Sequence, residues 1–402
     1  MKLLFVHDGE KLKEDEDGIF YTDGSYNKEV WDRYLTIFGN VTVMFRKDSK
    51  IYNPVYAKGN FQFFDKVRIN FIEIPNFTSS IWSFLNLRNR LDNKKKIKEV
   101  VKQSDYLIAR LPSNAGNLAV KYAKKYKKPY LIEVVGCPWD SYWNHSLKGK
   151  IIAPGAMLSM RRVVKHAPFV IYVTNKFLQY RYPNNMKNIG CSDVTLKEFN
   201  NSLIDERLKK ISNFDDQLKK VIGTTAAIDV KYKGQQYIIE ALSVLRKQGI
   251  TNIEYQLVGA GDQSYLKSIA KQYGVEEQVI FLGTLPHEQV FKWLNQLDIY
   301  TQPSRQEGLP RALIEAMSRG LPAFGARTGG IPELLEDKYI FSNSKRNIDE
   351  ICKILQFFNK DNMSNNATRN FNESKKYDKE IIKGIRNKFL NEFIQSGIKN
   401  TN

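Results

Sequence analysis

The sequence predicts an α/β protein with two doubly wound, Rossmann-like domains that face a central cleft. Two observations predict this fold class. The 402 residues are too many for one ordinary core, although 42% hydrophobic and 26% charged residues are values typical of globular proteins. In both halves, short strand-like runs alternate with helical runs. Such alternation produces parallel sheets with helices on both faces, and ligands bind such sheets at the carboxyl ends of the strands.

Five apolar runs in the first half of the chain have the length and composition of buried strands. We predict these strands over 2–8, 41–46, 105–110, 129–136 and 169–174. Apolar residues at helical spacing predict helices over 28–38, 117–126 and 155–167. Residues 184–217 are polar, and we predict no strand there. We therefore assign residues 1–200 to the first domain.

The second half repeats this alternation. Strands are predicted over 219–225, 253–259, 278–283, 298–304 and 321–326. Helices are predicted over 237–249, 264–274, 287–296 and within 307–322. We assign residues 201–375 to the second domain. Residues 376–402 form a charged C-terminal helix, which we expect to pack back toward the first domain.

Several classes of protein are disfavoured by composition. No stretch of eighteen apolar residues is present, and Met1–Asp8 lacks the long apolar region of a signal peptide. The three cysteines are scattered and odd in number, without the spacing of metal ligands. We expect a cytoplasmic protein in a reducing compartment.

The formal net charge of +19 predicts attraction to polyanions. Thirteen Lys or Arg against three Asp or Glu lie between Arg88 and Lys128. In segment 77–103, apolar residues precede a run of lysines, among them Ile81, Trp82, Phe84 and Leu85. Two interpretations stay open: a helix lying on an anionic membrane surface, or a core-facing helix with a solvated basic face.

The segment 307–322, EGLPRALIEAMSRGLP, places two carboxylates around a helix start. Pro310 suits the first helical position and Gly320 the exit. Free N–H groups at a helix start bind phosphate, while carboxylates such as Glu307 and Glu315 accept hydrogen bonds from hydroxyls. This arrangement would bind a nucleotide sugar. Without the neighbouring residues, however, both Glu residues would be explained as ordinary helix formers or dipole partners.

Those neighbouring residues carry a resemblance to a family. The run 256–335 contains a G-x-G loop, FLG, LDIYTQPS, EGLP, EAMSRGLP and GGIPELL, in that order. It resembles the donor domain of the retaining glycosyltransferases of family 4, which have the two-domain GT-B fold. The resemblance implies that residues 1–200 bind the acceptor and residues 201–375 bind the nucleotide-sugar donor.

The resemblance also implies a role for each matching residue. Glu307 would contact the transferred sugar and Glu315 the ribose, while Gly308 and Leu309 would offer backbone N–H groups. Leu285 would be a further donor contact.

Lys233, which precedes Gly234, would neutralise the diphosphate. Thr224 stands where the family has an Arg. Either Lys231 replaces that Arg, or Thr224 and Thr225 donate neutral hydrogen bonds.

In the first half, Gly24 lies where the family has a glycine-rich turn near the donor phosphate. After the strand 129–136 the family often places a polar residue near the reaction centre. Here Asp140 and His145 are the options, and we favour Asp140 as a catalytic residue. Trp139 and Trp143 could stack on sugar rings.

We therefore predict a metal-independent, retaining hexosyltransferase at the inner face of the cell membrane. It would transfer a sugar from a UDP- or GDP-linked donor to a glycan or lipid-linked acceptor in cell-surface polysaccharide biosynthesis. We expect no cofactor, and no Asp-x-Asp motif that would bind a metal lies between the two halves. Two alternatives are kept: a nucleotide-sugar hydrolase, epimerase or inactive partner subunit on the same fold, and a nucleic-acid-binding protein. The latter rests on charge alone, without a recognition motif.

Overall fold

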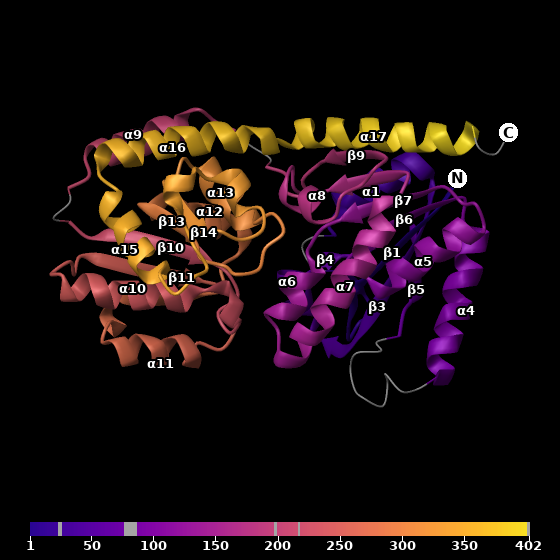
Figure 1. The fold of residues 1–402 in the computed structure, drawn as a ribbon, viewed down its shortest axis with the longest axis horizontal. Coiled ribbons are helices and arrows are strands. Elements are labelled where there is room, and N and C mark those ends of the chain that lie inside the picture. The colour runs from indigo at the N-terminus through magenta and orange to yellow at the C-terminus, as the bar shows by residue number, and fades with distance from the viewer. Residues whose placement is uncertain (23–25, 76–86, 197–198, 216–217, 400–402) are drawn as a thin grey trace. The chain divides into compact units, whose positions relative to one another are not determined.

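The computed structural model describes residues 1–22, 26–75, 87–196, 199–215 and 218–399, which form two compact units (Figure 1). Unit 1 comprises Met1–Pro138, Pro154–Asp193 and Ile385–Asn402. Unit 2 comprises Trp139–Ala153 and Val194–Gly384. The sequence predicts two uninterrupted domains that meet at residue 200, followed by a C-terminal helix over 376–402. Here unit 2 also includes Trp139–Ala153 from the range predicted for the first domain, and Ile385–Asn402 belong to unit 1.

Unit 1 is built on one sheet, most of whose strands run parallel. Along the sheet, β5, β3, β1, β6, β7, β8 and β9 pair in parallel, and β2 and β4 extend it antiparallel beside β1. The strands are β1 (Lys2–Asp15), β2 (Phe20–Thr22), β3 (Asn40–Tyr52), β4 (Gln62–Phe63), β5 (Ile69–Glu73), β6 (Tyr106–Leu111), β7 (Tyr130–Val134), β8 (Phe169–Tyr172) and β9 (Lys187–Gly190). The central strands are buried on both faces, which explains their continuous apolar sequences.

Helices connect these strands, as the parallel pairing requires. They are α1 (Lys28–Phe38), α2 (Pro54–Asn60), α4 (Leu87–Gln103), α5 (Asn114–Lys125), α6 (Pro138–Trp143), α7 (Leu147–Lys165) and α8 (Phe177–Arg181). Of these, α6 from Trp139 onward and α7 as far as Ala153 belong to unit 2. In α4, Ile97 and Val101 are fully buried, whereas Lys94, Lys95 and Lys96 are exposed. The described part of α4 is therefore a core-facing helix with a solvated basic face. The apolar residues Ile81, Trp82, Phe84 and Leu85 lie outside the described residues.

Two predictions for the first half are wrong. Residues 187–190 form β9, an edge strand paired with β8, although no strand is predicted in 184–217. Its residues are exposed or half-buried, so no apolar run marks it. Helix α7 begins eight residues before the predicted start, with Pro154 inside it. Pro154 is exposed, so water can satisfy the backbone carbonyl that loses its helical partner.

Unit 2 contains a six-stranded parallel sheet in the order β12-β11-β10-β13-β14-β15, the doubly wound order in which β10 and β13 flank the switch point. Its strands are β10 (Lys220–Thr225), β11 (Ile253–Val258), β12 (Val279–Gly283), β13 (Ile299–Gln302), β14 (Ala323–Ala326) and β15 (Ile340–Phe341). Its helices are α9 (Ser202–Ser212), α10 (Gln235–Lys247), α11 (Ser264–Tyr273), α12 (His287–Gln296), α13 (Arg311–Ser318), α14 (Ile331–Leu334), α15 (Asn347–Phe357) and α16 (Lys360–Ser374).

Each face of this sheet has its own core. Ile222, Ile299 and Phe324 point to one face and pack with α10, α11 and α15. The adjacent residues Tyr300 and Ala323 point to the other and pack with α12, α13 and α14. Side chains alternate along a strand, so neighbouring residues stabilise opposite layers and the sheet lies between helices (Figure 1).

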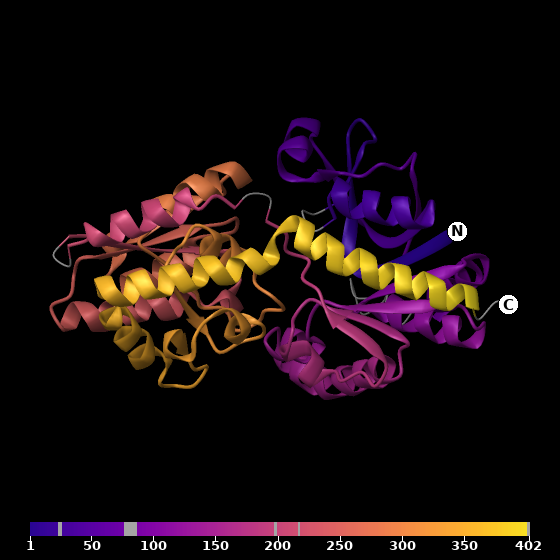
Figure 2. The ribbon, with the colours of Figure 1, turned by 90° about the horizontal axis from the view of Figure 1, so that it is seen from above.

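The last helix, α17 (Lys379–Lys399), begins in unit 2 and belongs to unit 1 from Ile385 onward; it is the unbroken yellow helix of Figure 2. Arg386 anchors it in unit 1, where the guanidinium group donates to Glu133 Oε1 at 2.9 Å and to Asp193 Oδ1 at 2.7 Å. Arg110 also pairs with both carboxylates. Among the described residues, no helix is long and apolar enough to cross a membrane.

Candidate donor-binding site

The candidate site lies in unit 2, where β10 and β13 pair side by side and the strand order reverses. The loop after β10 carries Lys233, at the end of the short 3-10 turn Lys231–Lys233. The loop after β13 carries Glu307 and leads into α13. Both loops leave the carboxyl ends of adjacent strands, the place where doubly wound sheets bind ligands.

Lys233 and Glu307 contact each other directly. The Nζ of Lys233 donates to Oε1 of Glu307 at 2.8 Å, and their side chains are only 23% and 12% exposed. Gly234 makes this approach possible. Its φ is +80°, and a Cβ there would lie 2.0 Å from the backbone oxygen of Pro303.

A hydrogen-bonded chain supports Glu307 from the strand side. Gln302 Nε2 donates to Glu307 Oε1 at 3.2 Å, and the Tyr300 hydroxyl donates to Gln302 Oε1 at 3.0 Å. Burial raises the pKa of Tyr300, so this hydroxyl keeps its proton. The Glu307 carboxylate is thus held in place before any ligand binds. Gln302 and Tyr300 carry no signal of a site in the sequence, because both belong to the buried strand β13.

The backbone of the same loop offers donors. Within the described residues, the N–H groups of Gly308 and Leu309 donate to no protein acceptor. The carbonyl oxygen of Gly308 accepts from the N–H of Gly330 at 2.7 Å, which fixes the loop. Gly329 has a φ of +56°, and a Cβ there would lie 2.2 Å from the Glu307 carbonyl oxygen. The pair Gly329–Gly330 therefore lets a second loop pack against the Glu307 loop.

Glu315 lies in α13 with its side chain 9% exposed, and its Oε1 is 3.1 Å from His287 Nε2. His287 begins α12 and is largely exposed. Leu285, just before α12, is half-buried against the core on that face of the sheet. In the predicted helix, Leu313, Ala316 and Met317 are fully buried, and Gly320 adopts a φ of +63° at the exit. His287 is a partner of Glu315 that the sequence pattern did not reveal.

Thr224 does not line this site. Its side chain is buried, its hydroxyl donates to the Thr301 carbonyl oxygen at 3.0 Å, and Tyr255 donates to it at 2.8 Å. These bonds occupy the hydroxyl inside unit 2 and argue against the predicted donor contact. Thr225, the last residue of β10, is half-buried, and its N–H lies 3.4 Å from the Tyr300 hydroxyl oxygen.

The family has an Arg at the position of Thr224, and here two cationic residues lie in the loops after β10 and β13. The Nζ of Lys231 lies 4.5 Å from the centre of the Tyr265 ring, on the side of α11. Arg305 follows β13, and its N–H donates to the Tyr232 carbonyl oxygen at 2.7 Å, one residue before Lys233. Its guanidinium carbon lies 4.2 Å from the Tyr237 ring centre. Arg305 is therefore a second cation-bearing residue of the Lys233 loop region, which the sequence pattern did not reveal.

Most of the remaining predicted residues lie in or just after α6, which belongs to unit 2 from Trp139 onward; Asn144, one residue after α6, donates to the Arg305 carbonyl oxygen at 3.2 Å. Asp140 occupies the first turn of α6 and is half-buried. Trp139 and Trp143 stack on each other, with ring centres 5.0 Å apart. His145 is exposed after α6. Gly24 lies outside the described residues. Within those ranges, no group of three His, Cys, Asp or Glu residues is arranged to hold a metal ion.

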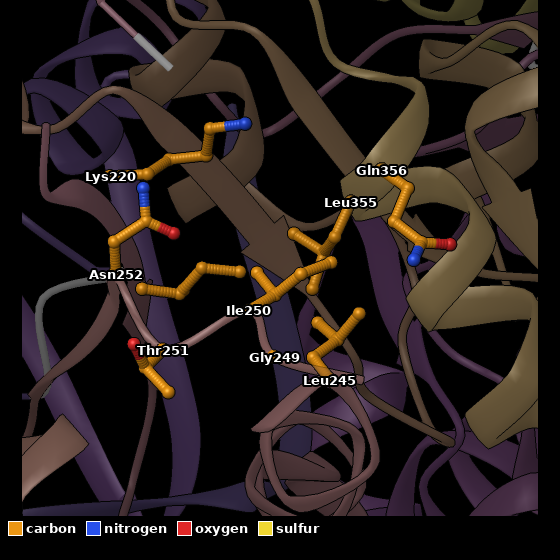
Figure 3. A pocket seen from close by; sticks show the side chains of 9 residues that line it. Lys220, Leu245, Gly249, Ile250, Thr251, Asn252, Leu355 and Gln356 are labelled. Atoms are coloured by element: carbon orange, nitrogen blue, oxygen red, sulfur yellow. The ribbon is translucent and has the colours of Figure 1, made fainter. Parts of the chain in front are cut away.

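A separate pocket of about 490 Å³ lies in unit 2 at the amino-terminal ends of the strands, opposite the candidate site (Figure 3). Lys220 and Ile253, the first residues of β10 and β11, line it together with Leu355 and Gln356. The Lys220 amino group donates to the Phe358 carbonyl oxygen at 3.2 Å. This pocket is at the amino ends of the strands, so we do not assign the donor to it.

Comparisons with known proteins show which family this chain belongs to. The family model described as "Glycosyl transferases group 1" matches residues 205–376. Protein CapJ of Staphylococcus aureus is 33% identical over 97% of this chain and 95% of its own length. The chain belongs to the group 1 glycosyltransferases.

Other relatives and structures extend this result. The amylovoran biosynthesis glycosyltransferase AmsK of Erwinia amylovora is 38% identical over 26% of this glycosyltransferase and 27% of AmsK. The structure of HepE from Anabaena in complex with UDP-glucose is similar with a TM-score of 0.64 at 16% identity, over 98% of this chain and 100% of HepE. The predicted family and the predicted GT-B fold are confirmed.

Proposed function

We propose that this glycosyltransferase transfers a hexose from a UDP- or GDP-linked donor to a hydroxyl of a glycan or lipid-linked acceptor, with retention of anomeric configuration. The observation that carries the proposal is the Lys233–Glu307 pair at the switch point, beside the backbone N–H groups of Gly308 and Leu309, which donate to no acceptor in the described part of the chain. Relatives named for polysaccharide assembly, such as AmsK for amylovoran, support a role in cell-surface polysaccharide biosynthesis. We place the reaction at the cytoplasmic face of the membrane.

Each residue of the site would bind a different part of the nucleotide-sugar donor. Lys233 and the N–H groups of Gly308 and Leu309 stabilise the diphosphate, Glu307 accepts hydrogen bonds from sugar hydroxyls, and Glu315 holds the ribose. A cation and fixed dipoles aimed at developing charge stabilise a leaving phosphate without a metal. Thr225 and Leu285 stay as further proposed contacts, and Thr224 is left out.

In the reaction, the bond between the anomeric carbon and the diphosphate oxygen breaks, and the acceptor oxygen bonds to that carbon from the same face. The acceptor proton passes to the departing phosphate oxygen. Asp140, kept from the sequence prediction, would orient the acceptor.

A thermal-shift screen with UDP-, GDP-, ADP- and CDP-sugars tests the proposal. At least one donor should raise the melting temperature of the wild type, and Glu307→Gln and Glu315→Ala should lose most of that increase. Glu277→Gln, an exposed carboxylate on the same unit, is the control and should keep it. Equal stabilisation of all variants would contradict the site. Donor consumption by water alone would favour the hydrolase alternative.

A further inference from the structure

Helix α7 carries an aliphatic stripe that faces solvent. Leu147, Ile151 and Leu158 are 80%, 82% and 51% exposed. Their intervals of four and seven residues return to the same side of a helix with 3.6 residues per turn. The buried residues of this helix lie on the opposite side: Ala153, Met160 and Val164. α7 is therefore apolar on two sides, and only one of them packs on protein.

Cations accompany the stripe along its whole length. Lys148 and Lys150 are exposed on its two flanks near Ile151, and Arg162 and Lys165 are exposed beyond Leu158. Between Asp140 and Asp193 the sequence holds eight Lys or Arg residues and no Asp or Glu. A stretch of 52 residues without an acid gives this part of the protein a positive potential that no neighbouring acid along the chain offsets.

This combination selects one kind of partner. A nucleic acid is bound by cations and hydrogen-bonding side chains, and an exposed line of three aliphatic residues adds nothing to phosphate contacts. The central part of a protein interface is enriched in aromatic residues and depleted of lysine, which is the reverse of α7. A helix with aliphatic residues on one face and lysines along its edges matches the boundary of an anionic bilayer, where lysine stems lie along apolar surface and their amino groups reach the phosphates.

We propose that α7 is the surface by which this protein binds an anionic lipid bilayer, with Leu147, Ile151 and Leu158 entering the boundary between headgroups and acyl chains. The proposal concerns binding alone and is independent of sugar transfer. It differs from the interpretation kept open from the sequence, in which segment 77–103 lies on an anionic membrane surface. In the described part of α4, Ile97 and Val101 are buried in the core and Leu91 is 62% exposed, so a single exposed apolar residue, rather than a stripe, accompanies its lysines.

The contribution of charge to membrane binding is tested with the full chain and two sets of vesicles, one of phosphatidylcholine alone and one of phosphatidylcholine with phosphatidylglycerol. The wild type should co-sediment with the anionic vesicles only, and less so as salt is raised. One lysine near such a surface is worth about fivefold in partitioning. Lys148→Gln with Lys150→Gln should therefore lower partitioning roughly 20- to 30-fold. The control, Lys94→Gln with Lys95→Gln on α4, removes the same charge and should change it less than about threefold.

A second pair of double variants tests how much the aliphatic side chains contribute to vesicle binding. Ile151→Ser with Leu158→Ser should lower partitioning into anionic vesicles about tenfold or more, because their aliphatic area no longer leaves water. Val55→Ser with Val67→Ser is the control, since these valines are 81% and 98% exposed and lie outside α7. Circular dichroism and thermal melting verify that each variant is folded.

Several results would overturn the proposal. These are no binding of the wild type to anionic vesicles, equal binding to neutral ones, or an α4 control that loses as much as the α7 charge variant. Binding that depends on the lysines and not on Ile151 and Leu158 would identify a general polyanion surface instead, and the proposal would then be wrong.

Discussion

The amino group of Lys233 lies 2.8 Å from a carboxylate oxygen of Glu307, although 74 residues separate them in the chain. The two residues come from loops after adjacent strands, so the doubly wound order itself brings the proposed phosphate cation to the proposed sugar-binding carboxylate. In the absence of a donor, each neutralises the other's charge. A bound diphosphate would compete with Glu307 for Lys233, and the sugar hydroxyls would compete with Lys233 for Glu307.

This arrangement predicts a specific effect of Lys233→Met. Loss of the cation removes stabilisation of the leaving diphosphate, and turnover with the best donor should fall about 10²- to 10³-fold. Lys231→Met is the matched control, because its amino group lies over the Tyr265 ring. It should stay within about threefold of the wild type. Steady-state kinetics measures both variants, and equal losses would show that general charge, rather than this contact, is what matters.

Gly329→Ala should lower activity through the Glu307 loop. Its Cβ would lie 2.2 Å from the Glu307 carbonyl oxygen, so the loop must move. We expect kcat/KM to fall at least about tenfold, since small displacements of a positioning group are costly. Gly274→Ala separates this effect from backbone strain, because Gly274 has a similar φ of +66° and open space around it. That control should lose about 1 kcal/mol of stability and keep its activity; a similar loss of activity in both variants would contradict the explanation.

Arg386→Met should destabilise unit 1. The Arg386 side chain is 2% exposed, and its removal leaves Arg110 as the one cation paired with the buried Glu133 carboxylate among the described residues. Breaking such a pair costs about 3–5 kcal/mol of unfolding free energy. The control is Lys187→Met, which breaks an ion pair between Lys187 of β9 and Glu392 of α17. Because Lys187 is 58% exposed, we expect this variant to lose about 0.5 kcal/mol of unfolding free energy. Denaturant unfolding compares the two, and equal values would contradict the proposed anchoring of α17.

The loss of unfolding free energy at acidic pH should depend on Asp193. Burial alone would raise the pKa of Asp193, but Arg110 and Arg386 lower it to about 2. A lowered pKa gives stability that is present above the unfolded value near 4 and is lost as the pH falls through about 2. The difference in unfolding free energy between wild type and Asp193→Asn should thus be constant from about pH 7 to 5 and shrink between about pH 4 and 2. Asp205→Asn, at an exposed site, should show no such trend. A difference that stays constant down to pH 2 would exclude this role for Asp193.

Much of the donor site could be predicted from the sequence because its residues are tied to chain order. Glu307, Gly308 and Glu315 lie around one helix start, and local rules place them without knowledge of distant contacts. The strands of unit 2 were also recognisable, since burial on both faces makes them continuously apolar. The edge strand β9 gave no such signal, because its first two residues, Lys187 and Asn188, are exposed and polar and so resemble a loop.

What could not be predicted depends on contacts between distant residues. His287 meets Glu315 and Gln302 supports Glu307 only after the sheet has formed. Thr224 was placed in the site because a motif position suggested it, whereas the inward direction of its side chain follows from alternation along β10. The aliphatic stripe of α7 was missed because the predicted helix began at residue 155, after Leu147 and Ile151.

The most direct test is whether Glu307 and Glu315 bind different parts of the donor. Calorimetric titration measures the affinity of each variant for the nucleoside diphosphate and for the matching nucleotide sugar. Glu315→Ala should weaken both ligands about 10- to 100-fold, because each contains the ribose and a hydrogen bond to a charged group is worth about 1.5–3 kcal/mol. Glu307→Gln should weaken only the nucleotide sugar. If Glu307→Gln weakens the bare diphosphate as strongly as the nucleotide sugar, or if Glu315→Ala weakens neither ligand, the proposed site is wrong.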